Sequence, residues 1–324
     1  MRRAPFLTVA AFLLACPAKQ APQTTAPAPP APRYYVVGPQ ATRSLGRDPV
    51  TLLPGFGVVI TAQWDHAGMR IGRTRLGREL PMRDLRPARP STFAGVELKG
   101  RPLDFGWVVR AGAVVRADPE PAGRVRARKP LYACLPLQTR DGPQDYYRIA
   151  EGWIAADDFR VPTLSPPPAG VGPDEPWLDV DLATQTLVAY VGREAQFATL
   201  VATGVGAEGS AFATPLGEHR IRAKLLATTM DNLSHTDVVP YSYEEVPFTQ
   251  YIGRVALHGA FWHDQFGHRR SHGCINLSLA DAERLFAFTR PQLPAGAREI
   301  AARPPFTSTL IRVRGKPAPM NGQR

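Results

Sequence analysis

The residues best suited to chemistry lie in one stretch of nineteen positions, 258–276, which reads HGAFWHDQFGHRRSHGCIN. It contains the thiol of Cys274, four histidines and three glycines. A thiol attacks an acyl group as the thiolate, so a nucleophilic cysteine requires a neighbouring imidazole or cation and partial exposure. Gly259 and Gly273 leave room for a substrate backbone, and successive amides in such a turn can donate to a developing oxyanion. The stretch therefore predicts a nucleophile, Cys274, in a histidine-rich loop.

Two histidines are candidates for the general base. His272 precedes Cys274 by two positions, so both side chains would lie on one side of an extended segment. His258 lies sixteen positions before Cys274 (274 − 258), and the apolar residues 255–257 predict a strand that would hold it rigidly. The spacing alone does not decide between them.

The same stretch offers a second chemistry, because histidine and cysteine side chains also bind zinc. The histidines at 258, 263, 268 and 272 have successive spacings of five, five and four, which match neither a helical nor a knuckle pattern. No nearby glutamate is placed to act as a base. A zinc hydrolase is therefore the weaker alternative; His263 and His268 are interpreted as polar loop residues, and we expect no metal and no cofactor.

A contiguous run around the cysteine resembles a known family. The residues Ser271-His272-Gly273-Cys274-Ile275-Asn276, with His258 upstream, resemble the signature of the L,D-transpeptidases that carry a YkuD-type catalytic domain. The segments 177–190 and 214–217 are also similar to that domain. The resemblance implies a mainly β fold, in which a β-sheet catalytic domain with one or two helices follows a β-rich region.

The resemblance also implies a role for each residue of the run. Cys274 would be the nucleophile and His258 the general base, with the carbonyl of Gly259 orienting the imidazole. The amides of Gly273 and Cys274 would stabilise the oxyanion, and Ser271 would help to shape the turn. The full supporting and oxyanion set is Gly259, Ser271, His272, Gly273 and Asn276.

The reaction implied by the resemblance is acyl transfer on peptidoglycan stem peptides. Cys274 would attack the amide between a diamino acid and a terminal D-alanine, release D-alanine and hold the stem as a thioester until an amine accepts it. Crosslinking, protein anchoring, exchange and hydrolysis differ only in the acceptor, which the sequence does not identify. A non-catalytic peptidoglycan-binding lipoprotein is the alternative outside enzyme chemistry.

Composition limits the other partners. The chain has 324 residues, a formal charge of +11, 34 prolines and 28 glycines, so we expect two or three domains rich in turns and short strands. Its one dense basic stretch, 124–129, is short and has no aromatic residues. The charge therefore suits anionic envelope polymers or lipid headgroups rather than nucleic acid.

The N-terminus predicts export. Residues 1–15 combine a basic start with a short apolar run and read as a signal peptide, and Leu13-Leu14-Ala15-Cys16 resembles a bacterial lipobox. Lipidation of Cys16 would give a membrane-anchored lipoprotein on the periplasmic side of the cell envelope; an ordinary signal peptide is the alternative. Residues 16–33, rich in proline and alanine, predict an extended tether. Cys134 is then interpreted as a strand residue, and a disulfide to Cys274 is disfavoured because it would block the nucleophile.

Residues 34–162 predict a β-rich region with an internal repeat. Leu80-x-x-x-Asp84-Leu85-Arg86 recurs as Ile154-x-x-x-Asp158-Phe159-Arg160, and Gly152-Trp153-Ile154 resembles a strand of SH3-like wall-binding modules. Two such modules, or a single irregular β domain, would fill this region. The proline-rich residues 163–176 predict a linker.

Residues 177–314 predict the catalytic domain, and 315–324 a tail. Alternation over 177–182 predicts a half-buried strand, followed by strands at 186–191, 196–203, 218–224 and 306–313. The run Gly204–Gly209 has the spacing G-x-G-x-x-G, but no helix pattern follows it, so a dinucleotide site is rejected. Ser278 predicts a helix N-cap with Asp281 in a capping-box position and Pro291 beyond the end. Tyr241, Tyr243 and Tyr251 would lie in a lid.

Overall fold

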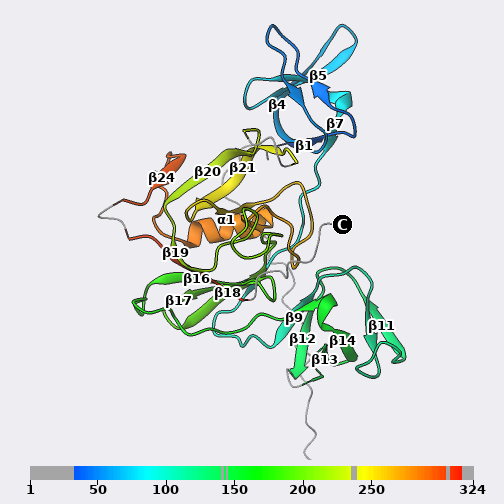
Figure 1. Cartoon of the computed structure of the whole chain (residues 1–324), viewed down its shortest axis with the longest axis vertical. Coiled ribbons are helices and arrows are strands. Elements are labelled where there is room, and N and C mark those ends of the chain that lie inside the picture. The colour runs from blue at the N-terminus through cyan, green and yellow to red at the C-terminus, as the bar shows by residue number, and fades with distance from the viewer. Residues whose placement is uncertain (1–32, 140–141, 144, 235–238, 304–306, 316–324) are drawn as a thin grey trace, which may run out of the picture. The chain divides into compact units, whose positions relative to one another are not determined.

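Strands dominate the structure, a computed structural model that describes residues 33–139, 142–143, 145–234, 239–303 and 307–315 (Figure 1). The mainly β fold class is confirmed, and α1 (Leu279–Phe288) is the one α-helix in these ranges. The predicted signal peptide, the lipidation site Cys16 and nearly all of the tether and tail lie outside the described residues. None of the described helices is long and apolar enough to cross a membrane.

The described residues divide into two compact units, one of 104–159 and one that combines 33–103 with the chain from 160 onward. The first unit is built on a seven-stranded antiparallel sheet in the order β11-β10-β14-β13-β12-β9-β15. Its elements are β9 (Phe105–Val108), β10 (Ala113–Arg116), β11 (Val125–Lys129), β12 (Cys134–Thr139), β13 (Tyr146–Ile149), β14 (Gly152–Ala155), the 3₁₀ turn η2 (Ala156–Asp158) and β15 (Phe159–Arg160).

Both copies of the repeat seen in the sequence adopt the same local structure. Residues 80–86 run from a strand through a 3₁₀ turn into a second strand, and 154–160 do the same. In each copy the residue after the turn, Leu85 or Phe159, is buried. The repeat is therefore a packing motif in which the residue after each 3₁₀ turn is buried in the core. The identity of the modules as SH3-like stays a prediction.

The N-terminal part of the second unit forms a small β assembly. Its core contains Val37, Phe56, Val58, Leu80 and Leu85. Its elements are β1 (Arg33–Val37), β2 (Thr42–Arg43), β3 (Thr51–Leu52), β4 (Gly57–His66), β5 (Met69–Thr74), β6 (Glu79–Pro81), η1 (Met82–Asp84) and β7 (Leu85–Pro87). The next strand, β8 (Val96–Glu97), pairs instead with β18.

The rest of this unit packs two sheets around α1 (Figure 1). One sheet has the order β19-β25-β16-β17-β18-β8. The other contains β23-β22-β21, with β20 beside β21 and β24 beside β20. Ala282 and Leu285 of α1 share one apolar core with Leu178 and Val180 of β16 and with Leu257 of β22. The elements are β16 (Pro176–Asp181), β17 (Thr186–Val191), β18 (Glu194–Leu200), β19 (Gly217–Arg220), β20 (Ala223–Asp231), β21 (Ser242–Tyr251), β22 (Ala256–Gly259), β23 (Ile275–Leu277), β24 (Glu299–Ala301) and β25 (Leu310–Arg314).

The strand β16 corrects the prediction of a half-buried strand, because all six of its residues are buried. Asp179 and Asp181 face arginines of the neighbouring parallel strand β25. Both carboxylate oxygens of Asp179 accept hydrogen bonds of 2.7 Å, one from Arg312 Nε and one from Arg314 Nε. Because arginines of β25 pair with them, Asp179 and Asp181 can lie on the second face of β16 although that face is also buried.

Several other predicted boundaries were wrong. The strand expected at 218–224 is broken into β19 and β20, and the last strand begins at Leu310 instead of 306. Tyr243 and Tyr251 belong to β21, so the predicted lid is in large part a sheet strand.

The helix α1 begins as predicted, with the Ser278 hydroxyl accepting a hydrogen bond of 3.2 Å from the Asp281 amide. The Asp281 carboxylate differs from the capping-box prediction, since it accepts from the Gly95 amide and the Thr199 hydroxyl. At the other end, the ammonium of Lys224, which is fully buried, donates to the carbonyls of Phe286 (2.6 Å) and Thr289 (2.8 Å). A buried cation thus complements the C-terminal end of the helix dipole.

We predict that Asp179→Ala destabilises the protein by about 3–5 kcal/mol, because it leaves the largely buried Arg312 without its carboxylate partner and leaves Arg314 with Asp181 alone. The matched control is Asp65→Ala, which removes the exposed ion pair with Arg70 (2.9 Å) and should cost less than about 1 kcal/mol. Urea unfolding of both variants measures the difference. Similar losses in the two variants would contradict the assignment of Asp179 as a buried structural charge.

Candidate active site

Two adjacent parallel strands bring the predicted nucleophile and base together. In β22 and β23, His258 is paired with Asn276, and Cys274 directly precedes β23. Side chains at alternate positions of neighbouring strands point to the same face. Cys274, His258 and Asn276 accordingly line one cavity of about 330 Å³.

The cavity has an aromatic wall. Tyr243 stacks on Trp262 with ring centroids 3.8 Å apart, and Tyr241 stacks on His272 at 4.8 Å. Pro54, Gly55 and Phe56 of the N-terminal β assembly line the other side of the cavity, and no sequence pattern predicted them there. The described residues that line the cavity are Pro54, Gly55, Phe56, Met230, Val239, Pro240, Tyr241, Tyr243, His258, Trp262, Arg270, Ser271, His272, Cys274 and Asn276.

The imidazole of His258 is held in one tautomer. Its side chain is 2% exposed, and Nδ1 lies 3.1 Å from the carbonyl oxygen of Gly259. Since a carbonyl only accepts, Nδ1 carries the proton and Nε2 keeps a free lone pair. Burial lowers the pKa of His258 to about 4, only partly opposed by the Gly259 hydrogen bond, so the ring is neutral at pH 7. A neutral imidazole with Nε2 unprotonated has the form that a general base requires.

Cys274 carries a free thiol and is half-buried. Desolvation raises the pKa of the Cys274 thiol, while a hydrogen bond from the Ala256 backbone and the charge of Arg254 act in the opposite direction. The resting site therefore pairs a neutral thiol with a neutral imidazole. Cys134 lies half-buried in β12, and because Cys274 is a free cysteine the two are not joined.

The turn before Cys274 is tied together by Ser271. Its hydroxyl donates to the Cys274 carbonyl and accepts from the Gly273 amide at 3.1 Å. From a distant segment, the Thr214 hydroxyl donates to the Gly273 carbonyl at 2.8 Å. The Gly273 amide, expected to stabilise an oxyanion, is therefore already engaged within the turn.

The extended segment on which His272 was considered as a base does not form. Gly273 has a φ of +117°, so the chain bends between His272 and Cys274. The exposed His272 ring stacks on Tyr241 with an interplanar angle of 8° and meets Phe212 edge-on at 5.0 Å. This geometry suits a wall of the cavity and leaves His258 as the better-placed base.

His263 is a neighbour of the site that the sequence analysis did not identify. It was interpreted as a polar loop residue, yet its Nε2 lies 3.0 Å from the side-chain nitrogen of Asn276. Burial and the charge of Arg270 lower the pKa of His263 to about 4. The regular spacing of the histidines held no signal for this contact, because it depends on how the loop folds back over β23.

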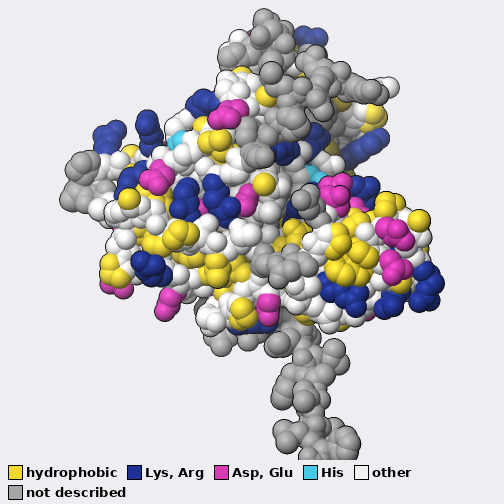
Figure 2. All heavy atoms as spheres, turned by 60° about the horizontal axis from the view of Figure 1, so that its bottom comes forward, with side chains coloured by type: hydrophobic (Ala, Val, Ile, Leu, Met, Phe, Trp, Pro, Cys, Tyr) yellow, Lys and Arg dark blue, Asp and Glu magenta, His cyan; other side chains and the backbone are white. Residues whose placement is uncertain are grey.

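Two other kinds of site were considered from the sequence, a metal site and a dinucleotide site, and the described residues form neither. Within the described ranges, no three His, Cys, Asp or Glu side chains are grouped so that they could hold a metal ion. The glycine run 204–209 is followed by turns and then by β19, without the helix that a dinucleotide site requires. On the face seen in Figure 2, Lys and Arg side chains are spread among Asp and Glu.

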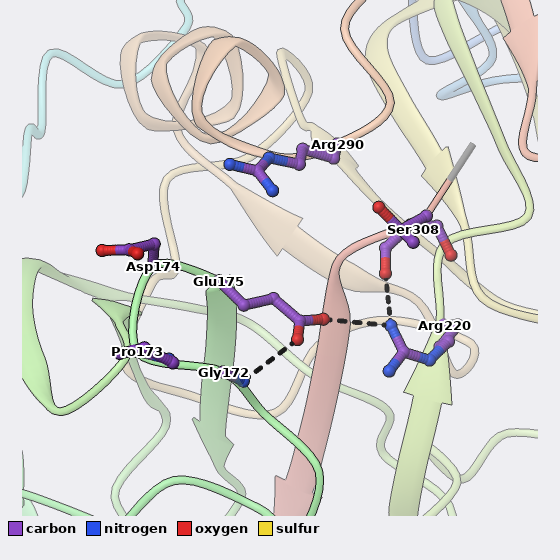
Figure 3. A pocket seen from close by; sticks show the side chains of 8 residues that line it. Gly172, Pro173, Asp174, Glu175, Arg220, Arg290 and Ser308 are labelled. Atoms are coloured by element: carbon purple, nitrogen blue, oxygen red, sulfur yellow. Dashed lines mark hydrogen bonds and ion pairs between the residues drawn. The ribbon is translucent and has the colours of Figure 1, made fainter. Parts of the chain in front are cut away.

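A second hollow, of about 550 Å³, lies at the end of the linker and is not lined by the reactive residues. Figure 3 shows Glu175 reaching toward Arg220, with which it forms an ion pair of 3.3 Å, and Arg290 opposite. It contains no thiol or imidazole from the 258–276 stretch, whereas the Cys274 cavity is lined by His258, His272 and Cys274 of that stretch.

Part of the chain is similar to a known protein family. Residues 175–300 match the YkuD family model, described as an L,D-transpeptidase catalytic domain. No curated protein matches the chain. A crystal structure of a mutant Enterococcus faecium L,D-transpeptidase is 21% identical over 43% of this chain and 50% of that one, with a TM-score of 0.32, so the match spans half of that protein. An L,D-transpeptidase from Mycobacterium smegmatis is 15% identical over 79% of this chain and 98% of that one, also with a TM-score of 0.32.

The neutral resting pair predicts how alkylation of Cys274 depends on pH. Since only the thiolate reacts and the pKa of the thiol lies above its ordinary value, the iodoacetamide rate should rise about tenfold per pH unit from pH 6 to 8.5. A resting ion pair of thiolate and protonated imidazole would instead give a rate that is already level in this range. Mass spectrometry of the labelled protein measures the rate, with Cys274→Ser as the unlabelled control.

Proposed function

We propose that this chain, whose residues 175–300 form an L,D-transpeptidase catalytic domain, is a cysteine-dependent transpeptidase that acts on peptidoglycan tetrapeptide stems. The observation that supports the proposal most directly is the shared cavity in which Cys274 lies beside a buried, neutral imidazole with its Nε2 unprotonated. An acceptor for the thiol proton and a free thiol are the two groups that acyl transfer through a thioester requires.

In the first half-reaction, Cys274 Sγ attacks the carbonyl carbon between the L-centre of the diamino acid and the terminal D-alanine. The thiol proton passes to Nε2 of His258 as the carbon–sulfur bond forms. The resulting imidazolium returns that proton to the leaving nitrogen, the carbon–nitrogen bond breaks, and D-alanine departs. The stem remains as a thioester on Cys274.

In the second half-reaction, an amine attacks the thioester carbonyl and gives its proton to His258. The carbon–sulfur bond breaks, and the sulfur regains a proton. Throughout, the Gly259 carbonyl keeps Nδ1 protonated and is well placed to stabilise the imidazolium that forms twice per cycle. Another stem as the amine gives a crosslink, which we take as the principal outcome.

The oxyanion is stabilised in this proposal by the amide of Cys274. The Gly273 amide is occupied by the Ser271 hydroxyl, whereas the Cys274 amide has no acceptor among the described residues. The Ser271 hydroxyl donates to the carbonyl of Cys274 and thereby helps to fix the backbone of this residue. One preorganised donor of this kind typically contributes about 10²–10³ in rate.

We further propose that the chain is a lipoprotein held in the cell envelope on the periplasmic side by lipid on Cys16. The support is the sequence alone: a short apolar run that ends in Leu-Ala-Cys and leads into residues 17–33, which contain no large apolar side chain. Such an anchor would keep the catalytic domain near the peptidoglycan, where its substrate lies.

The catalytic proposal predicts a covalent adduct on incubation with a tetrapeptide stem. Intact-mass analysis should show the protein with the stem attached minus D-alanine, and Cys274→Ala should show none, because no other free thiol is available among the described residues. His258→Gln should slow adduct formation by about 10²–10⁴ through loss of the base.

The matched control is His66→Gln, which changes an exposed histidine on the β4–β5 hairpin and should react like the parent protein. A parent protein that binds peptidoglycan but never forms the adduct would overturn the enzyme proposal in favour of a wall-binding role.

The anchor predicts a modified N-terminus in protein purified from membranes of the native host. Peptide mass spectrometry should find Cys16 as the first residue, carrying diacylglycerol on its thiol, and Cys16→Ser should leave the membrane fraction. Cleavage elsewhere, or a Cys16 peptide recovered in a disulfide linkage, would contradict the proposal.

A further inference from the structure

The loop between His258 and Cys274 contains a histidine whose proton can be located from its contacts. The backbone amide of Gln265 donates to Nδ1 of His263 at 3.3 Å. A backbone amide can only donate, so Nδ1 must hold a lone pair, and in a neutral imidazole the proton then resides on Nε2. Nε2 of His263 is therefore a donor.

The partner of this donor is the carboxamide of Asn276, whose nitrogen lies 3.0 Å from Nε2. Two donors face each other in that arrangement, while Oδ1 of Asn276 is buried with no hydrogen-bond partner among the described residues. The oxygen and nitrogen ends of a carboxamide occupy nearly the same space, and hydrogen bonding decides their order. Turning the group by 180° gives Oδ1 the Nε2 proton and resolves both conflicts.

The turned carboxamide presents its NH₂ group where the unpartnered oxygen stood. Asn276 is 3% exposed, lies beside His258 in the register of β22 and β23, and lines the same cavity as Cys274. A buried NH₂ group without a protein acceptor has two unsatisfied hydrogens, which a ligand oxygen in the cavity would satisfy.

We propose that His263 is a positioning residue that fixes the Asn276 carboxamide with its oxygen toward Nε2, so that the NH₂ group donates to a carbonyl or carboxylate oxygen of the bound stem peptide. The inference rests on the proposed function for the identity of the ligand, and on the hydrogen bonds alone for the orientation.

The surroundings of His263 support a fixed, neutral ring. It lies against Phe266 with ring centroids 5.2 Å apart and against Trp262 at 6.1 Å. Desolvation lowers the pKa of His263 to about 4, with Arg270 and His258 acting in the same direction and Asp264 opposing them. Protonation would place a second proton on Nδ1 against the Gln265 amide, which the loop geometry opposes.

The orientation is tested by the ¹⁵N chemical shifts of the His263 imidazole in the free full-length protein between pH 6 and 8. We expect the Nε2-protonated tautomer, and a protonated Nδ1 would overturn the proposal. The measurement needs no turnover, so it decides the role of His263 even if the stem peptide proves not to be a substrate.

The consequence for the substrate is tested with two variants of His263. A glutamine places its side-chain NH₂ near the position of Nε2 and should keep the donor, whereas a phenylalanine keeps the ring without any donor. His263→Phe should lower the rate of adduct formation by about tenfold to a hundredfold, and His263→Gln should retain most of the parent rate. Equal losses in both variants, or no loss in either, would refute the positioning role.

A double-mutant cycle separates this role from general support of the loop. If His263 acts through Asn276, His263→Phe should have no further effect on the rate in an Asn276→Ala background, whereas independent effects would multiply. Iodoacetamide labelling of Cys274 should remain at the parent rate in His263→Phe, because the thiol and His258 are unchanged. Multiplying effects, or a matching fall in labelling, would show a structural role instead.

Discussion

The parallel pairing of β22 with β23 is the constraint on which the site depends. It fixes His258 next to Asn276 and leaves Cys274 one step before the strand, so three side chains reach one cavity from two rigid elements. The same burial that aligns them removes water, which raises the pKa of the thiol and lowers that of the imidazole. In the proposed reaction, thiol and imidazole would become charged only at the moment of attack, when a substrate carbonyl could take up the negative charge.

Buried charges away from the site hold these strands in place. Asp179 joins β16 to β25 through two arginines, and Lys224 of β20 binds the last carbonyls of α1, the helix that packs on β21, β22 and β23. Each group is costly to bury and tolerable only with its partners in place. A sheet and helix fixed in this way can position an imidazole by means of one backbone carbonyl.

Features that depend on residues close together in the sequence could be predicted from it, whereas contacts between distant segments could not. The spacing of His258 and Cys274 predicted that the two residues share a site, and both line one cavity. Ser278 located the start of α1, because this signal is confined to a short segment. The arginine partners of Asp179 lie more than 130 positions away, and local alternation could not reveal them. Pro54–Phe56 and His263 were missed for the same reason, since only the folded chain brings Pro54–Phe56 to the cavity and His263 to Asn276.

The glycine run that resembles a nucleotide-binding motif has a different physical purpose here. A Cβ on Gly204 would lie 2.3 Å from the Phe212 carbonyl oxygen and 3.0 Å from the Cα of Gly273, closer than side-chain carbons approach. Three segments thus converge on the turn before Cys274 with only backbone between them, and Thr214 joins Gly204 to Gly273 through its hydroxyl. A glycine is required at position 204 because the turn before Cys274 is supported there by backbone packing, which leaves no room for a side chain.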